Sequence, residues 1–151
     1  MARVLVVDSD EDSANALAGV LECAGHRVRV ADRGEGADDL ASAVRAEIVL
    51  VARRLADIDG LKLLCRLKER PATTATPVMM LMGDGGHDAS EAATACALGA
   101  SDCMFGVAEA ADAVTKVNRS LAMTVATSRR WLSHVWDVQP VPEVFRAPLA
   151  A

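Results

Sequence analysis

"EIVLVARRLADIDG" (Glu47–Gly60) opens on an apolar, β-branched run and then turns polar. Runs such as Ile48–Val51 are typical of a strand that is buried on both faces of a parallel sheet. The strand is followed by Ala52, and Gly60 comes eight residues later. Functional sites in such sheets form at the carboxyl ends of the strands. Alanine has no reactive side chain, so the function of a site at this strand end is an open question.

The rest of the chain alternates between short apolar runs and segments with helical spacing. We expect strands at Arg3–Val7, Arg27–Val30, Ile48–Val51, Val78–Met82 and Ser101–Phe105, and helices at Glu11–Ala24, Gly34–Arg45, Leu61–Glu69, Asp88–Leu98 and from Glu109 onward. Strands that alternate with helices predict a parallel sheet with helices on both faces.

The composition fits one soluble domain with an aliphatic core. Of the 151 residues, 52% are hydrophobic and only 3% aromatic, and the net charge is -5. This balance argues against direct nucleic-acid binding, which favours a basic face. No apolar run approaches the roughly 18 residues of a membrane span, so we expect a cytoplasmic protein.

The four cysteines, Cys23, Cys65, Cys96 and Cys103, form no CxxC pair and no zinc spacing. All four lie in apolar contexts. We therefore expect the cysteines to be small, buried hydrophobic residues of a protein in a reducing cytoplasm, and we expect no metal site.

Four segments together resemble the receiver domain of two-component response regulators, over residues 2–123: RVLVVDSDED, EIVLVARRLADIDGLKLL, TPVMMLMG and ALGASDCMF. The resemblance implies an α/β, flavodoxin-like (βα)5 fold. This fold is a doubly wound, five-stranded parallel sheet of order 2-1-3-4-5, here with an extended C-terminal helix. Receivers of this family accept a phosphoryl group from a histidine kinase onto an aspartate. The resemblance therefore implies a signalling protein as partner.

The positions that carry the family's chemistry depart from its pattern. Asp8 matches the first acidic residue, but Ser9 stands for the second, Ala52 for the acceptor aspartate, Met82 for the Ser/Thr, Gly106 for the lysine and Cys103 for the aromatic switch residue. A methyl group cannot accept a phosphoryl group, and Mg²⁺ favours carboxylates together with phosphate oxygens. We therefore expect a pseudo-receiver with no catalytic activity and no Mg²⁺ or other cofactor. It would signal by protein-protein contact, independently of phosphorylation.

The vacated acceptor position leaves alternatives open. Either Arg53 or Arg54 reaches Asp8 or Asp57 and fills the pocket with a fixed cation, or both arginines are solvated. A second function is also open: the less charged pocket around Ala52, Met82 and Gly106 could hold a small ligand, because ligand pockets are mostly apolar.

We expect a receiver-like domain at residues 1–123, a helical extension at 124–137 and a proline-containing, extended or disordered tail at 138–151. Apolar residues continue at helical spacing through Val125, Leu132 and Val135, and the only tryptophans of the chain, Trp131 and Trp136, lie in the same extension. Since Trp is enriched at interface anchors, this extension is expected to form a homodimer or to bind a partner. The alternative is that it folds back over its own domain.

Overall fold

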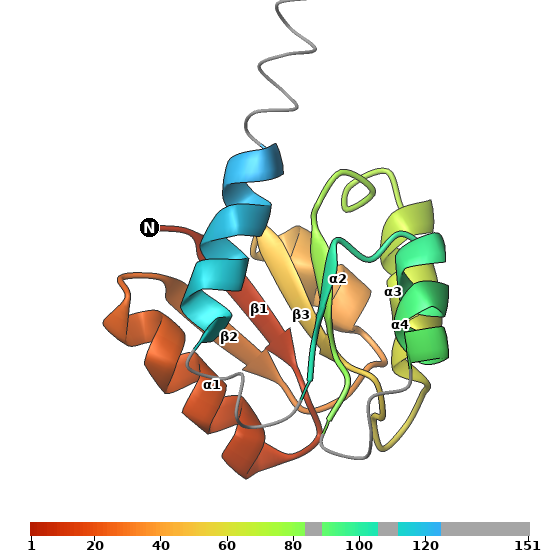
Figure 1. The fold of residues 1–151 in the computed structure, drawn as a ribbon, viewed down its shortest axis with the longest axis horizontal. Coiled ribbons are helices and arrows are strands. Elements are labelled where there is room, and N and C mark those ends of the chain that lie inside the picture. The colour runs from red at the N-terminus through yellow and green to blue at the C-terminus, as the bar shows by residue number, and fades with distance from the viewer. Residues whose placement is uncertain (84–88, 106–111, 125–151) are drawn as a thin grey trace, which may run out of the picture. The chain divides into compact units, whose positions relative to one another are not determined.

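The computed structural model describes residues 1–83, 89–105 and 112–124, in which strands and helices alternate (Figure 1). The elements are β1 (Arg3–Val7), α1 (Glu11–Cys23), β2 (Arg27–Ala31), α2 (Ala37–Ala43), β3 (Ile48–Ala52), α3 (Gly60–Glu69), β4 (Val78–Leu81), α4 (Ala89–Ala97) and β5 (Asp102–Met104). Residues 113–124 are also helical. Among the helices of these ranges, none has the length and apolar character needed to cross a membrane.

The strands form one parallel sheet of order β2-β1-β3-β4-β5. This order confirms the predicted doubly wound, flavodoxin-like fold. The central strand β3 is buried along its whole length, as expected for a run without polar side chains.

The sheet supports a separate hydrophobic cluster on each face, because successive side chains of a strand point to opposite sides. In β3, Val49 and Val51 belong to the cluster that includes residues of α2, α3 and α4. Ile48 and Leu50 belong to the cluster that includes residues of α1 and of the helical segment 113–124. Figure 1 shows helices on both sides of the sheet.

Aspartates begin two of the helices at the carboxyl end of the sheet. The side chain of Asp10 accepts hydrogen bonds from the amides of Asp12 and Ser13, and that of Asp59 accepts from the amide of Leu61. Helix α2 is shorter than predicted. It begins after Gly36, whose φ of 81° is outside the helical range and which supplies no side-chain cap.

The prediction that the cysteines are buried was wrong for two of the four. Cys103 is buried and Cys65 is half-buried, but Cys23 and Cys96 are exposed. Apolar neighbours in sequence did not decide burial here, because adjacent helical residues face different directions. Cys96, for example, follows the fully buried Ala95.

Contacts divide the chain into a unit of Met1–Leu121 and a second unit of Ala122–Ala151. Only residues 122–124 of the second unit are described. The predicted interface residues (Val125, Trp131, Leu132, Val135 and Trp136), the proline-containing tail and Gly106 lie outside the described residues.

Gly60 allows α3 to begin directly against the end of β3. A Cβ atom at this position would overlap the carbonyl oxygen of Ala52 and lie 2.9 Å from that of Arg53. Both obstacles are backbone atoms, so neither can move without displacing the strand. The glycine is therefore required by close approach rather than by its φ angle.

We expect Gly60→Ala to lower the free energy of unfolding by about 3 kcal/mol, the upper part of the range for overpacked sites. The matched control is Gly19→Ala within α1, where a Cβ would meet nothing within 4 Å. The control should raise stability by about 0.5–1 kcal/mol through helix propensity. Urea denaturation of both variants measures the difference, and equal stabilities would contradict the close-approach argument.

Candidate functional site

The candidate site lies where β1, β3 and β4 end, on both sides of the point at which the strand order reverses. Asp8 follows β1, Ala52 closes β3 and Met82 follows β4. Because β1 pairs with β3 and β3 with β4, the structure brings these three residues to one edge of the sheet. Ala52, to which the sequence resemblance assigns the acceptor position, is 7% exposed.

Asp8 is a partly buried carboxylate that is held by backbone. Its Oδ1 accepts a hydrogen bond of 3.0 Å from the amide of Asp10. Burial is the largest influence and raises the pKa of Asp8; the amide of Asp10 lowers it and the Asp10 charge raises it. The charged form of Asp8 is therefore disfavoured in the fold.

Ser9 uses its hydroxyl to join three loops. Its Oγ donates to the carbonyl oxygen of Asp32 at 2.8 Å and accepts from the amide of Ala56 at 2.9 Å. The loop after β1 is thereby linked to the loop after β2 and to the loop after β3. The residue at the family's second acidic position thus has a structural hydrogen-bonding role.

Asp57 fastens the loop after β3 to the segment before α2. Its carboxylate accepts from the amide of Gly34 at 2.9 Å and from that of Glu35 at 2.8 Å. The amide of Glu35, followed by that of Gly34, lowers the pKa of Asp57. Gly34 also leaves space that the Ile58 side chain occupies, since a Cβ there would overlap it.

Arg53 joins the loop after β3 to α4. Its Nη1 lies 2.6 Å from Oδ1 of Asp59, and its Nη2 lies 3.7 Å from Oε1 of Glu91. The Arg53 side chain is only 19% exposed, and its Nε is buried without a hydrogen-bond partner. Neither alternative therefore holds for Arg53: it pairs with neither Asp8 nor Asp57, and it is not a solvated side chain. Arg54 is exposed and meets Asp59 through a backbone bridge.

Two positions of the family pattern have apolar or thiol side chains within the core. Met82 packs, partly buried, against the cluster that faces α3 and α4, and Cys103 is buried in that cluster. Neither residue offers the hydroxyl or the aromatic ring of the family pattern.

The residues present do not fit a Mg²⁺ ion. Ala52 offers no oxygen from its side chain, and the Ser9 hydroxyl already makes two hydrogen bonds. Within the part of the chain that the structure describes, no group of three or more His, Cys, Asp or Glu could hold a metal ion. A single partly buried carboxylate, Asp8, is a poor substitute for the oxygen set that Mg²⁺ favours.

A shallow hollow of about 350 Å³ lies over the loop after β3 and is lined by residues 53–59. The lining includes two arginines and two aspartates, and neither Ala52 nor Met82 contributes to it. This hollow is therefore different from the apolar pocket that the small-ligand alternative requires.

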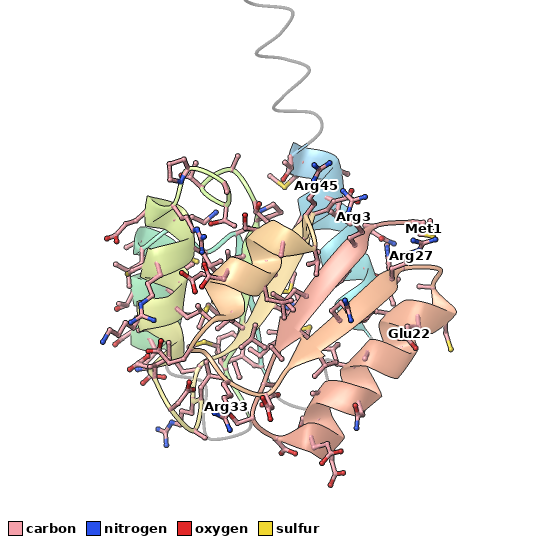
Figure 2. The ribbon with its side chains drawn as sticks, turned by 180° about the vertical axis from the view of Figure 1, so that it is seen from behind. Met1, Arg3, Glu22, Arg27, Arg33 and Arg45 are labelled. Atoms are coloured by element: carbon pink, nitrogen blue, oxygen red, sulfur yellow. The ribbon has the colours of Figure 1, made fainter. Side chains whose placement is uncertain are left out.

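A group of arginines lies at the end of the sheet opposite to the candidate site. Asp8, Asp10 and Asp57 lie at the carboxyl end, whereas Arg3 and Arg27 are register partners at the start of β1 and β2. Figure 2 shows Arg3, Arg27 and Arg45 at one end of the sheet, with Arg33 at the other. Nε of Arg3 donates to the carbonyl oxygen of Arg45 at 2.8 Å. The candidate site therefore lies at the end of the sheet remote from this arginine group.

Residues 4–118 match the family of response regulator receiver domains. With this match over most of the chain and the five-stranded fold, the protein belongs to that family. No curated protein sequence matches the chain significantly.

Solved structures agree with the family. A candidate response regulator from Chloroflexus aurantiacus is 31% identical with a TM-score of 0.73, over 80% of this chain and 98% of that one. The receiver domain of NtrX from Brucella abortus is 28% identical with a TM-score of 0.72, over 79% and 98%. Against a longer NtrX structure in complex with ATP, identity is 26% and the TM-score 0.78, over 94% of this chain but only 31% of that one.

Removing the guanidinium of Arg53 tests its role as a link. We expect Arg53→Met, which keeps the apolar stem, to lower the free energy of unfolding by about 1 kcal/mol, as for one lost hydrogen-bonded pair. It should also speed amide exchange in α4. The control Arg54→Met should stay within about 0.5 kcal/mol, since this side chain is exposed. Equal effects of the two variants in urea denaturation and hydrogen exchange would contradict the assignment.

Proposed function

We propose that this chain is a pseudo-receiver: a receiver domain that signals through protein-protein contact and independently of phosphorylation. The observation that carries the proposal is Ala52, a methyl group at the acceptor position of β3. Phosphoryl transfer needs an acceptor oxygen and compensation for the charge that develops on the phosphoryl oxygens. Ala52 does not provide the acceptor oxygen.

The surrounding positions support the same conclusion. Met82 has no hydroxyl, Gly106 has no ammonium group, and the Ser9 hydroxyl is engaged by Asp32 and Ala56. With Asp8 as the remaining carboxylate of the pattern, the protein is proposed to act without Mg²⁺, without another cofactor and without catalytic activity.

The link from Arg53 to Glu91 supports a single resting conformation. Arg53 follows the vacated acceptor position, and Glu91 belongs to the first turn of α4. This ion pair would connect the loop after β3 to α4 without a phosphoryl group. The α4 surface would then be presented to a partner constitutively.

The proposed partner is a histidine kinase or another signalling protein of the cytoplasm, or a second copy of this chain. Receivers of this family interact with such signalling proteins. Leu98, just after α4, is 40% exposed, and Met123 in the last described helical turn is 64% exposed. The homodimer hypothesis places Trp131 and Trp136 of the extension in the interface.

The absence of phosphorylation is tested by treating the full chain with acetyl phosphate and Mg²⁺ and measuring intact mass. We expect no phosphoryl adduct, because neither the acceptor nor the charge-compensating groups are present. A receiver domain with the acceptor aspartate serves as positive control. A phosphoryl adduct on this chain, at Asp8, Asp57 or any other acid, would contradict the proposal.

The proposed homodimer is tested by light scattering on a sizing column. We expect the unchanged full chain to elute as a dimer and a Trp131→Ala/Trp136→Ala variant to dissociate at least tenfold more readily, since buried tryptophans are common hot spots. Val107→Ala, outside the extension, is the control. A monomeric unchanged chain would reject the homodimer and leave a different protein as the partner.

A further inference from the structure

The strand β2 forms an open edge of the sheet, since its one partner among the described strands is β1. The amide of Arg27 donates to the carbonyl oxygen of Ala2 at 2.9 Å. Backbone groups of a strand alternate in direction, so every second residue from Arg27 bonds to the chain of β1. The amides and carbonyls of Val28 and Val30 therefore point away from the sheet. An edge of this kind can accept a further strand.

The register of β1 and β2 places several arginines on one face of this edge. Arg3 is the partner of Arg27, and Leu5 is the partner of Arg29. Leu5 is buried in the cluster on the side of α2, α3 and α4. Because side chains of a strand alternate between faces, the three arginines belong to this side as well. The carbonyl oxygen of Arg45 accepts from Nε of Arg3 at 2.8 Å. We call Arg3, Arg27, Arg29 and Arg45 the arginine surface.

The charge of the arginine surface is compensated only in part. Arg3 pairs with Glu47 at 3.4 Å. The side chains of Arg27, Arg29 and Arg45 are exposed, and within the described ranges they have neither an ion pair nor a hydrogen bond. Figure 2 shows Arg3, Arg27 and Arg45 together at this end of the sheet. The surface is thus positive on a chain whose net charge is -5, and it would attract an acidic ligand.

We propose that β2 and the arginine surface bind an extended acidic segment of a partner protein, which adds as a strand to the open edge. Carboxylates two residues apart on the segment would lie on the same face as Arg27 and Arg29, where opposite charges on adjacent strands attract. The residues between these carboxylates would lie beside Val28 and Val30, and Val30 is 42% exposed. A fitting segment therefore alternates acidic and apolar residues.

A second copy of this chain is a poorer occupant of the edge. Pairing β2 with β2, with the same faces aligned, would place Arg27 and Arg29 of one copy beside the arginines of the other. Like charges on adjacent strands are destabilising, and charged edge strands oppose association between edges. An acidic segment removes this repulsion, so charge favours a different protein.

Binding at this edge does not depend on the proposed function. The surfaces named there belong to α4 and to the extension, whereas this one belongs to β1, β2 and the residue Arg45 after α2. A phosphoryl adduct on the chain would contradict the pseudo-receiver and leave the edge unaffected. Failure of an acidic segment to bind would reject only the edge proposal.

The first test measures fluorescence anisotropy of the full chain with a fluorescein-labelled peptide of sequence GTEVEVEVTG. We expect saturable binding that weakens as salt is raised. The peptide GTEEEVVVTG has the same composition but cannot place its carboxylates at alternate positions, so it should bind about tenfold more weakly. Absence of saturable binding would overturn the proposal. Equal binding of the two peptides would also overturn it, by showing attraction through net charge alone.

The second test compares two variants that each lose two exposed arginines. Arg27→Gln/Arg29→Gln should weaken binding of the alternating peptide about tenfold, because charge-assisted hydrogen bonds are lost. The matched control is Arg33→Gln/Arg54→Gln, since Arg33 lies at the other end of the sheet and Arg54 in the loop after β3. The control should bind as the unchanged chain does. Far-ultraviolet circular dichroism checks the fold of both variants, and equal losses of affinity would contradict the assignment.

Hydrogen exchange followed by nuclear magnetic resonance locates the added strand. With the alternating peptide bound, the amides of Val28 and Val30 should exchange more slowly, because they gain hydrogen-bond partners. The amide of Arg27 should change little, since it already donates to Ala2. Binding without slower exchange at Val28 and Val30 would place the peptide elsewhere and overturn the proposal. Slow exchange of these two amides in a dimer without peptide would assign the edge to a second copy and also overturn it.

Discussion

The close contact between Gly60 and the end of β3 is the constraint on which the site depends. The amide of Gly60 donates to the Arg53 carbonyl oxygen at 3.1 Å, in a space that excludes a Cβ. Asp59, one residue earlier, both caps α3 through the Leu61 amide and pairs with Arg53. The loop after β3 is therefore closed by its own backbone and by one carboxylate.

Most of the acidic groups around this loop accept hydrogen bonds from nearby backbone amides. Asp57 receives two backbone amides and Asp10 two more. Asp8 is the exception, because burial raises its pKa more than its single amide lowers it. Carboxylates crowded around one pocket would repel one another without a cation. Ser9 and Ala52 reduce that repulsion, so the fold tolerates the pocket as it is.

The sequence predicted the sheet well because β3 and its neighbours consist of short, uniformly apolar runs. Such runs can be identified as strands without knowledge of distant residues. Ile48–Val51, for example, was found within one residue of its observed end. The sequence left the role of Arg53 open, because one of its two carboxylate partners, Glu91, lies on another helix and only the assembled fold brings the two together. The exposure of Cys96 was missed for a related reason: the rotation of α4 on the sheet determines which of two neighbouring residues is buried.

The hydrophobic clusters and the phosphorylation positions are largely separate parts of the structure. The clusters consist of side chains that point alternately to the two faces of β1, β3 and β4, together with the inward-facing residues of the helices. Both clusters are present although the sequence has no counterpart of the acceptor, the hydroxyl and the lysine of the family pattern. The two hydrophobic clusters therefore form without the family's residues at these positions. The ion pair from Arg53 to Glu91 connects the loop after β3 to the first turn of α4. A partner bound to α4 would therefore contact an element that this ion pair joins to the end of β3.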